Sequence, residues 1–191
     1  MGKKKISSII SVCGQICSGK TYAASAISEK LNIQIASFGT YVKFFCEKNG
    51  LQSDRKTLQD VGEHFVADNP TQFVMDVIEY SRGVSNEIIV EGIRHKVIFE
   101  SILQLANKNI SIFLEADKKI RYERFQRRKR GDTHFLTFEE FILLNNHPVE
   151  QEIEALKPLC DIVIDTTSDY SIDLIAQIDG FIRNKRQFKK Q

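Results

Sequence analysis

Eight consecutive residues, Gly14 to Thr21, carry the clearest chemical signal in the chain. They read Gly-Gln-Ile-Cys-Ser-Gly-Lys-Thr and fit the phosphate-binding pattern G-x-x-x-x-G-K-[ST]. Gly14 and Gly19 allow positive φ and let the backbone approach an anion closely. Lys20 would supply a full charge to the β- and γ-phosphates, and Thr21 a hydroxyl to Mg²⁺. Backbone amides complete the expected cradle, from Gln15, Ile16, Cys17 and Ser18.

The elements on either side of this loop are those that the motif requires. Ile6 to Val12 is a short apolar run that can form a buried strand. After the loop, apolar residues recur at helical spacing at Ala23, Ala24, Ile27 and Leu31. The partial positive charge at a helix N-terminus would add to the loop amides. The sequence therefore predicts a site for nucleotide phosphates, with ATP and Mg²⁺ as the expected ligands.

Strands and helices alternate along the rest of the chain. Short apolar runs predict four further strands, at 32–38, 88–90, 110–114 and 161–165. Helical patterns run from 40 to the break at Asn49-Gly50 and over 53–67, 72–82 (capped by Thr71), 96–106, 118–130, from 137 onward (a Thr137/Glu140 capping box), 151–156 and 171–183. This alternation predicts an α/β three-layer P-loop NTPase fold, in which helices cover both faces of a five-stranded parallel sheet. We expect one domain over 1–191, with a short helical lid at about 118–150 and a loose basic tail over 184–191.

Composition excludes several classes of protein. The formal net charge is only +2, so overall charge favours neither a nucleic-acid nor a membrane partner. The 4 cysteines form no C-x-x-C pair, which favours reduced thiols in a cytoplasmic protein. No apolar run approaches the length of a membrane span. A small-molecule nucleotide is the expected partner, and either a monomer or a homodimer fits.

Three groups of residues follow predicted strand ends, where this fold places its ligands. The first group is Glu91-Gly92-Ile93-Arg94. Glu91 could hold Mg²⁺ through water, or it could cap the next helix. Arg94 could pair with a phosphate bidentately, through two N–H groups of its guanidinium, or form a surface salt bridge.

The second group lies on the basic helix expected at 118–130. Arg121, Arg124 and Arg128 fall within a narrow arc at 100° per residue, so they share one face. Few acidic residues balance them, which favours a bound polyphosphate as the counter-charge. Binding of RNA or a plain solvated surface are the alternatives.

The third group, Ser37 to Lys43, follows the second predicted strand and could form the floor of the acceptor site. Lys43 would contact the acceptor phosphate, and Phe38 and Tyr41 would form walls. Either aromatic ring could instead belong to the core.

These residues together resemble the nucleoside monophosphate kinases, and within them the adenylate-kinase-like and dephospho-CoA-kinase-like proteins. The likeness runs from Ile9 to about Phe181. The Gly-Asp-x-x-Arg segment of adenylate kinases is similar to Gly39-Thr40-Tyr41-Val42-Lys43, with Thr for Asp and Lys for Arg. Their Asp-Gly-x-x-Arg segment resembles Glu91 to Arg94 in a form one residue shorter, and their lid arginine pair matches Arg124 and Arg128. The Ser/Thr-rich turn at 165–168 resembles their adenine-side loop.

The resemblance implies an ATP-dependent phosphotransferase. Lys20, Arg94, Arg124 and Arg128 would be catalytic. ATP would contact 14–21, Arg124 and Ser168, whereas the acceptor would contact Gly39, Tyr41, Lys43, Arg94 and Arg128. Thr21 and, through water, Glu91 would hold Mg²⁺. The departures at Thr40 and Lys43 leave open a nucleotide acceptor, a dephospho-CoA-like acceptor, or an RNA-associated ATPase or regulatory nucleotide-binding protein.

Overall fold

A computed structural model describes residues 6–81, 85–127, 137–145, 148–168 and 172–188. Five parallel strands form one sheet in the order β2-β3-β1-β4-β5. The strands are β1 (Ser8–Gly14), β2 (Gln34–Ser37), β3 (Glu87–Glu91), β4 (Lys108–Glu115) and β5 (Ile162–Asp165). The helices are α1 (Lys20–Leu31), α2 (Phe38–Lys48), α3 (Arg55–Asp68), α4 (Pro70–Ser81), α5 (Lys96–Leu105), α6 (Lys118–Arg127), α7 (Phe138–Asn145), α8 (Pro148–Ala155), the 3₁₀ turn η1 (Lys157–Leu159) and α9 (Ile172–Phe188).

Strand β1 lies at the centre of the sheet, between β3 and β4, and all of its residues are buried. A strand covered on both faces can be apolar without alternation, which is why Ile9, Ile10 and Val12 follow one another so closely. Because β1 ends at Gly14, the phosphate-binding loop starts at the middle of the sheet's carboxyl edge.

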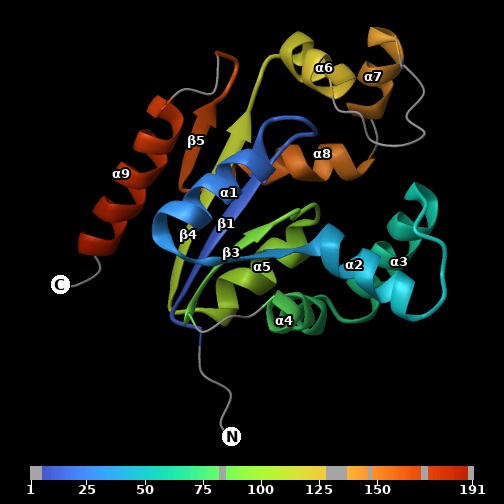
Figure 1. Cartoon of the computed structure of the whole chain (residues 1–191), viewed down its shortest axis with the longest axis horizontal. Coiled ribbons are helices and arrows are strands. Elements are labelled where there is room, and N and C mark those ends of the chain that lie inside the picture. Colours follow the sequence, from blue (N-terminus) through green and yellow to red (C-terminus); the bar gives the residue numbers. More distant parts are fainter. Residues whose placement is uncertain (1–5, 82–84, 128–136, 146–147, 169–171, 189–191) are drawn as a thin grey trace, which may run out of the picture.

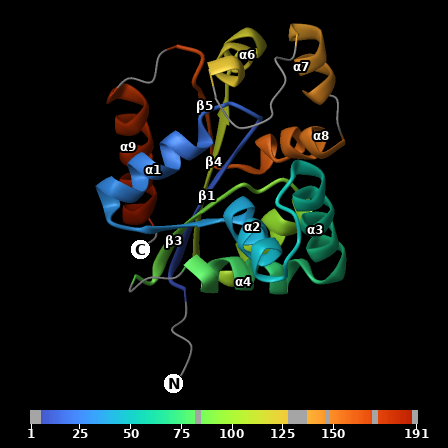
Figure 2. The same cartoon turned by 45° about the vertical axis from the view of Figure 1, so that its right-hand side comes forward.

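Helices cover both faces of the sheet, as Figures 1 and 2 show. On one face α1 and α9 pack against Ile10, Val12 and Ile112. On the other face α2, α4, α5 and α8 pack against Ile9, Val90 and other apolar residues. The expected three-layer fold with a five-stranded parallel sheet is confirmed.

Two helices begin earlier than the sequence predicts. Helix α2 starts at Phe38 rather than Thr40, because the Ser37 hydroxyl accepts a hydrogen bond from the Thr40 amide at 3.4 Å. Helix α4 starts at Pro70, so the predicted cap at Thr71 is wrong. The side chain of Asn69 accepts from the Gln72 amide at 3.0 Å instead.

The C-terminal third also departs from prediction at two points. Helix α8 begins at Pro148 rather than at residue 151, because proline is well suited to the first helical position, where its missing N–H costs nothing. Helix α9 continues to Phe188, so the expected loose tail is helical at its start, and Lys185 pairs with Asp161. The Thr137/Glu140 capping box is confirmed, with hydrogen bonds of 2.7 and 3.2 Å.

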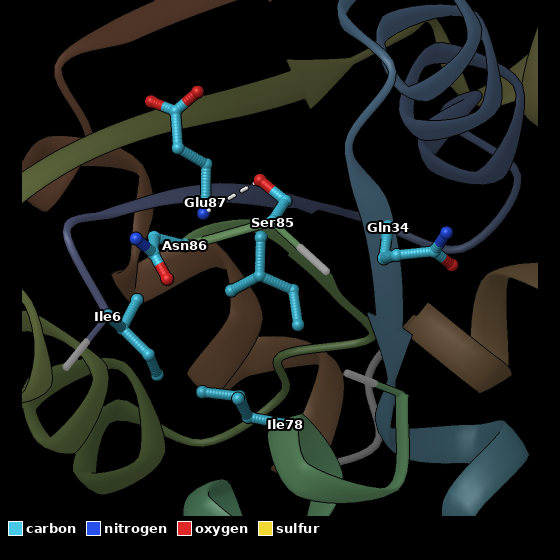
Figure 3. A pocket seen from close by; sticks show the side chains of 7 residues that line it. Ile6, Gln34, Ile78, Ser85, Asn86 and Glu87 are labelled. Atoms are coloured by element: carbon cyan, nitrogen blue, oxygen red, sulfur yellow. Dashed lines mark hydrogen bonds between the residues drawn. The ribbon is translucent and has the colours of Figure 1, made fainter. Parts of the chain in front are cut away.

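A small hollow lies at the opposite, amino-terminal edge of the sheet (Figure 3). Its lining comes from the starts of the strands and from α4: Ile6, Gln34, Ile78, Ser85, Asn86, Glu87 and Ile88. One hydrogen bond, from the Glu87 amide to the Ser85 hydroxyl at 3.0 Å, crosses its rim. The hollow is separated from the phosphate-binding loop by the length of the strands and has no part in that site.

Candidate active site at the phosphate-binding loop

The loop between β1 and α1 takes the backbone conformation that its glycines permit. Gly14 has φ +142°, and a Cβ there would lie 2.1 Å from the Leu114 carbonyl oxygen, so no other residue fits. Gly19, which precedes α1, is left-handed at φ 97°. Cys17 is left-handed too, at φ 59°, an uncommon conformation for a side chain with a Cβ. The loop is therefore held in a strained, ordered form.

Lys20 begins α1 and folds back over the loop, where its Nζ donates to the Gln15 carbonyl at 2.6 Å. Burial lowers the pKa of Lys20 from 10.5 to about 8, against the opposing effect of the Glu150 carboxylate. Arg94 adds to the lowering, whereas Glu91 opposes it. A phosphate group at this place would supply a stronger counter-charge than these two carboxylates, whose effect does not offset the burial of the lysine.

Thr21 and Glu91 meet at the carboxyl edge of the sheet, although 70 residues separate them in the chain. The Thr21 hydroxyl donates to Glu91 Oε2 at 3.2 Å. A hydroxyl and a carboxylate are hard oxygen ligands of the kind that Mg²⁺ takes beside substrate phosphates. Nearby, the buried Ser18 hydroxyl has no hydrogen-bond partner among the described residues. The donor set therefore fits a magnesium-bound phosphate.

Two arginines of α6 reach the loop. Arg121 is only 1% exposed; its Nε donates to the Ala116 carbonyl at 3.1 Å, and a terminal nitrogen donates to the Ile16 carbonyl at 3.4 Å. Burial lowers the pKa of Arg121. Arg124 donates to the Cys17 carbonyl at 3.5 Å. The predicted arginine face thus points at the loop, while Arg128 lies outside the described residues.

Thr166, the first residue after β5, joins three segments; sequence analysis placed it in the Ser/Thr-rich turn at 165–168 without a role of its own. Its buried hydroxyl has one proton to donate, and two carbonyl oxygens lie within hydrogen-bond distance of it, that of Ser18 at 2.9 Å and that of Glu115 at 3.0 Å. Arg124 donates to the same hydroxyl at 3.1 Å and also to the Thr166 carbonyl. Ser168, the residue predicted to contact ATP, is exposed two residues farther along this turn. The signal for Thr166 in the sequence was its position directly after a strand end.

Helix α8 supplies two carboxylates that sequence analysis also missed. Glu154 Oε2 accepts from Gln15 Nε2 at 2.6 Å, and Glu150 Oε2 accepts from the Ile16 amide at 3.3 Å. The two glutamates are four residues apart, so they lie on one side of the helix. That i, i+4 spacing was visible in the sequence, but nothing there indicated that the helix would pack against the loop.

The predicted acceptor residues are more loosely arranged. Gly39 and Lys43 are exposed, and Lys43 pairs with Glu47 on its own helix at 3.7 Å. Tyr41 packs against the rings of Phe65, Phe73 and Tyr80 at centroid distances of 5.7–6.0 Å, with Phe65 at 5.9 Å. Its ring therefore belongs largely to an aromatic cluster of α2, α3 and α4.

Arg94, the remaining predicted acceptor residue, follows β3 and is exposed. It forms no ion pair with the described part of the chain, but its charge acts on Lys20. The structure therefore brings Arg94 to the loop and leaves its guanidinium accessible.

Residues 10–140 match a family model described as "AAA domain". The chain belongs to this family. A curated relative, the nucleotide-binding protein DIP1313 of Corynebacterium diphtheriae, is 28% identical over 72% of the chain. The chain spans only 50% of the length of that relative.

Solved structures with the same fold include several named as kinases. A putative kinase from Chloroflexus aurantiacus covers 97% of the chain and 98% of its own, with a TM-score of 0.57 and 18% identity. Shikimate kinase from Acinetobacter baumannii covers 94% of both chains, with a TM-score of 0.60 and 16% identity. A gluconokinase from Sinorhizobium meliloti covers 98% and 99%, with a TM-score of 0.59 and 14% identity. The membership expected from the sequence, in a P-loop family related to the nucleoside monophosphate kinases, is confirmed.

None of the helices within the described ranges is both long and apolar enough to cross a membrane. All 4 cysteines are free thiols, as expected, and three of them are buried.

Proposed function

We propose that the chain is an ATP-dependent phosphotransferase that moves the γ-phosphoryl group of ATP to a nucleotide or nucleotide-like acceptor. The observation that carries this proposal is the convergence of cations from three elements on one loop: Lys20 from α1, Arg124 from α6, and Arg94 after β3. Phosphoryl transfer needs positioning and charge neutralisation above all, and this arrangement supplies both.

The reaction breaks the bond between the γ-phosphorus and the oxygen that bridges it to the β-phosphate. A new bond forms from an acceptor oxygen to the same phosphorus, and the bridging oxygen keeps the electron pair as ADP leaves. A monophosphate acceptor is already an anion near neutral pH because its second pKa is ~6, so no general base is required. Mg²⁺ held near Thr21 and Glu91 would neutralise phosphate charge when it is bound.

The chain's own residues have separate tasks in this scheme. Lys20 would bind the β- and γ-phosphates, and the loop amides would hold them in line. Arg124 bonds to the loop and to the β5–α9 turn, and these contacts support a role beside ATP. Arg94 follows β3, which lies on the other side of β1 from the β4 strand that leads to α6, and it would hold the acceptor phosphate. Ser168, in the turn after β5, would contact ATP, and Arg128, which lies outside the described residues, would contact the acceptor.

An acceptor screen tests the proposal. The protein is incubated with ATP and Mg²⁺ and each ribo- or deoxyribonucleoside monophosphate, and ADP and phosphorylated product are followed together. We expect one product to form in equal amounts with ADP, and Lys20→Ala to abolish both. Dephospho-CoA belongs in the screen, because transfer to it would favour a hydroxyl acceptor over a phosphate.

A nucleotide-binding regulator is the second candidate, because the curated relative carries only the name of a nucleotide-binding protein. ATP binding without phosphorylation of any acceptor would favour it. Salt-sensitive RNA binding, lost when the basic C-terminal residues are removed, would favour an RNA-associated ATPase.

A further inference from the structure

Helix α8 directs three carboxylates to three different partners. Glu150 accepts from the Ile16 amide at 3.3 Å, and Glu154 accepts from Gln15 Nε2 at 2.6 Å. Glu152, on another side of the helix, meets His95 Nδ1 at 3.0 Å in the β3–α5 connection. Only Glu150 therefore bonds to a backbone amide of the phosphate-binding loop.

Glu150 is also the acid that acts most strongly on the cations of the site. Among charged neighbours, its carboxylate has the largest effect on both Lys20 and the buried Arg121. In both cases it favours the protonated cation. Its bond to the Ile16 amide places this carboxylate on the loop that carries Lys20 and that also accepts from Arg121. Glu150 thus provides, from within the chain, the negative charge that Lys20 would otherwise obtain from a ligand.

This arrangement conflicts with a bound triphosphate. A γ-phosphate beside Lys20 would face the Glu150 carboxylate, and two anions in a partly desolvated site repel each other strongly. A divalent cation on the triphosphate cancels two of its charges and so reduces this repulsion.

We propose that Glu150 is a specificity-determining residue, whose carboxylate against the Ile16 amide makes the loop discriminate against polyphosphates that arrive without a divalent cation. The inference rests on the proposed binding of ATP at this loop. It concerns the form of the donor that is accepted, and not the acceptor or the transfer step.

The protonation of Lys20 sets the conditions for a test. Lys20 faces Glu150 from α8, Glu91 and Arg94 from β3 and the segment after it, and Cys17 from the loop. Removing the Glu150 charge would lower the pKa of Lys20 below about 8, which by itself weakens anion binding at high pH. Binding is therefore measured at a pH about 1.5 units below that value, where the lysine stays protonated.

The experiment measures the dissociation constant of ATP by calorimetry, with excess Mg²⁺ and with a chelator, for the wild-type protein and for Glu150→Gln. We expect Glu150→Gln to tighten binding of metal-free ATP by about tenfold and of Mg-ATP by about threefold at most, so the preference for the magnesium complex falls. Glu152→Gln removes a charge from the same helix without touching the loop, and its ratio should match the wild type. Inorganic tripolyphosphate should repeat the pattern without a base or ribose.

Two results would overturn the inference: an unchanged ratio in Glu150→Gln, or weaker binding of both forms, which would make Glu150 a support for the loop. If Glu150→Gln does not fold, as judged by its thermal melt, Glu150→Asp withdraws the carboxylate by one methylene and should shift the ratio part of the way. A wild-type protein that binds no Mg-ATP would contradict the proposed function instead, so the two failures are distinguishable.

Discussion

The two sides of the site are built differently. On the donor side, the loop, α6 and the turn after β5 are tied together by a network of hydrogen bonds centred on Thr166 and Arg124. On the proposed acceptor side, Gly39, Lys43 and Arg94 are exposed, and Lys43 pairs with Glu47 of its own helix at 3.7 Å. One half of the site is therefore held together by hydrogen bonds within the chain, whereas the other presents accessible cations.

This difference indicates what each half recognises. A network that fixes loop carbonyls and amides suits one invariant group, a polyphosphate. Exposed cations above an aromatic cluster suit an anionic acceptor whose own contacts complete the site. Four predictions would break or sharpen the distinction, and they follow in order of decreasing effect.

Loss of Lys20 should have the largest effect. Lys20→Ala removes the one full charge held inside the loop, and we expect the rate of phosphoryl transfer to fall by ~10²–10³. Single-turnover formation of ADP measures this rate. Lys96→Ala, at an exposed helical ion pair with Glu100, is the matched control and should leave the rate unchanged. If the rate in Lys20→Ala falls by less than threefold, the phosphate-binding loop does not contribute to phosphoryl transfer as proposed.

Replacing the arginine on each side of the site should affect the binding of a different substrate. Arg124→Ala should weaken ATP binding by about tenfold and leave the Michaelis constant of the acceptor unchanged, because its contacts are with the loop and Thr166. Arg94→Ala should raise the acceptor's Michaelis constant by about tenfold and leave ATP binding unchanged. Steady-state kinetics in both substrates separates the two. Equal effects of both variants on both substrates would abolish the distinction between the sides.

The pH dependence of ATP binding should report Lys20. With its pKa lowered to about 8, the lysine of the free protein is neutral above that pH, and bound phosphate must restore its proton. ATP affinity should therefore be flat below pH 8 and fall by up to about tenfold per pH unit above it. Calorimetry in two buffers of different ionisation enthalpy should detect proton uptake near pH 8.5–9, about half to one unit above that pKa.

Lys20 also determines the direction in which the free energy of unfolding changes with pH. Unfolded Lys20 keeps a pKa near 10.5, so between about 8 and 10.5 the unfolded chain binds more protons than the folded one. In that window Lys20 alone makes the free energy of unfolding rise with pH. An ATP affinity that stays constant from pH 7 to 10, about one unit below to two above the folded value, would contradict the lowered pKa.

Replacing either of two threonines tests the hydrogen-bond network around Thr166 and Arg124, with the smallest expected effect of the four predictions. Thr166→Val removes a buried hydroxyl that bonds to the Ser18 and Glu115 carbonyls, and should lower the free energy of unfolding by about 1–2 kcal/mol. Thr40→Val, on the exposed acceptor side, should change it by less than about 0.5 kcal/mol. Urea denaturation of both variants provides the comparison. Equal losses would show that the two sides are equally constrained.

Much of the fold follows from the sequence because its signals are local. The apolar runs predict five strands, and the loop pattern places Lys20 and Thr21 at the start of α1. The capping box at Thr137 and Glu140 is a contact between residues three apart, and it forms as expected.

The rest depends on contacts between distant segments, which local patterns do not encode. Thr166 reaches Ser18 across 148 residues, and Glu150 reaches Ile16 across 134. Glu150 belongs to no motif, and the Ser/Thr-rich turn that contains Thr166 does not indicate which carbonyls its hydroxyl meets. Only the packing of β5 and α8 against the loop gives the two residues these contacts. Arg121 was expected to face phosphate with Arg124, yet it lies buried beneath the loop.

The most direct test is a crystal structure of the protein with ADP, Mg²⁺, an accepted monophosphate and aluminium fluoride as a mimic of the phosphoryl group in transfer. The account predicts the fluoride between the two nucleotides, with Lys20 and Arg94 within about 3 Å of it and Arg124 beside the ADP phosphates. It would be contradicted by a filled site in which Arg94 and Arg124 both stay away from every phosphate and Lys20 keeps its bond to the Gln15 carbonyl.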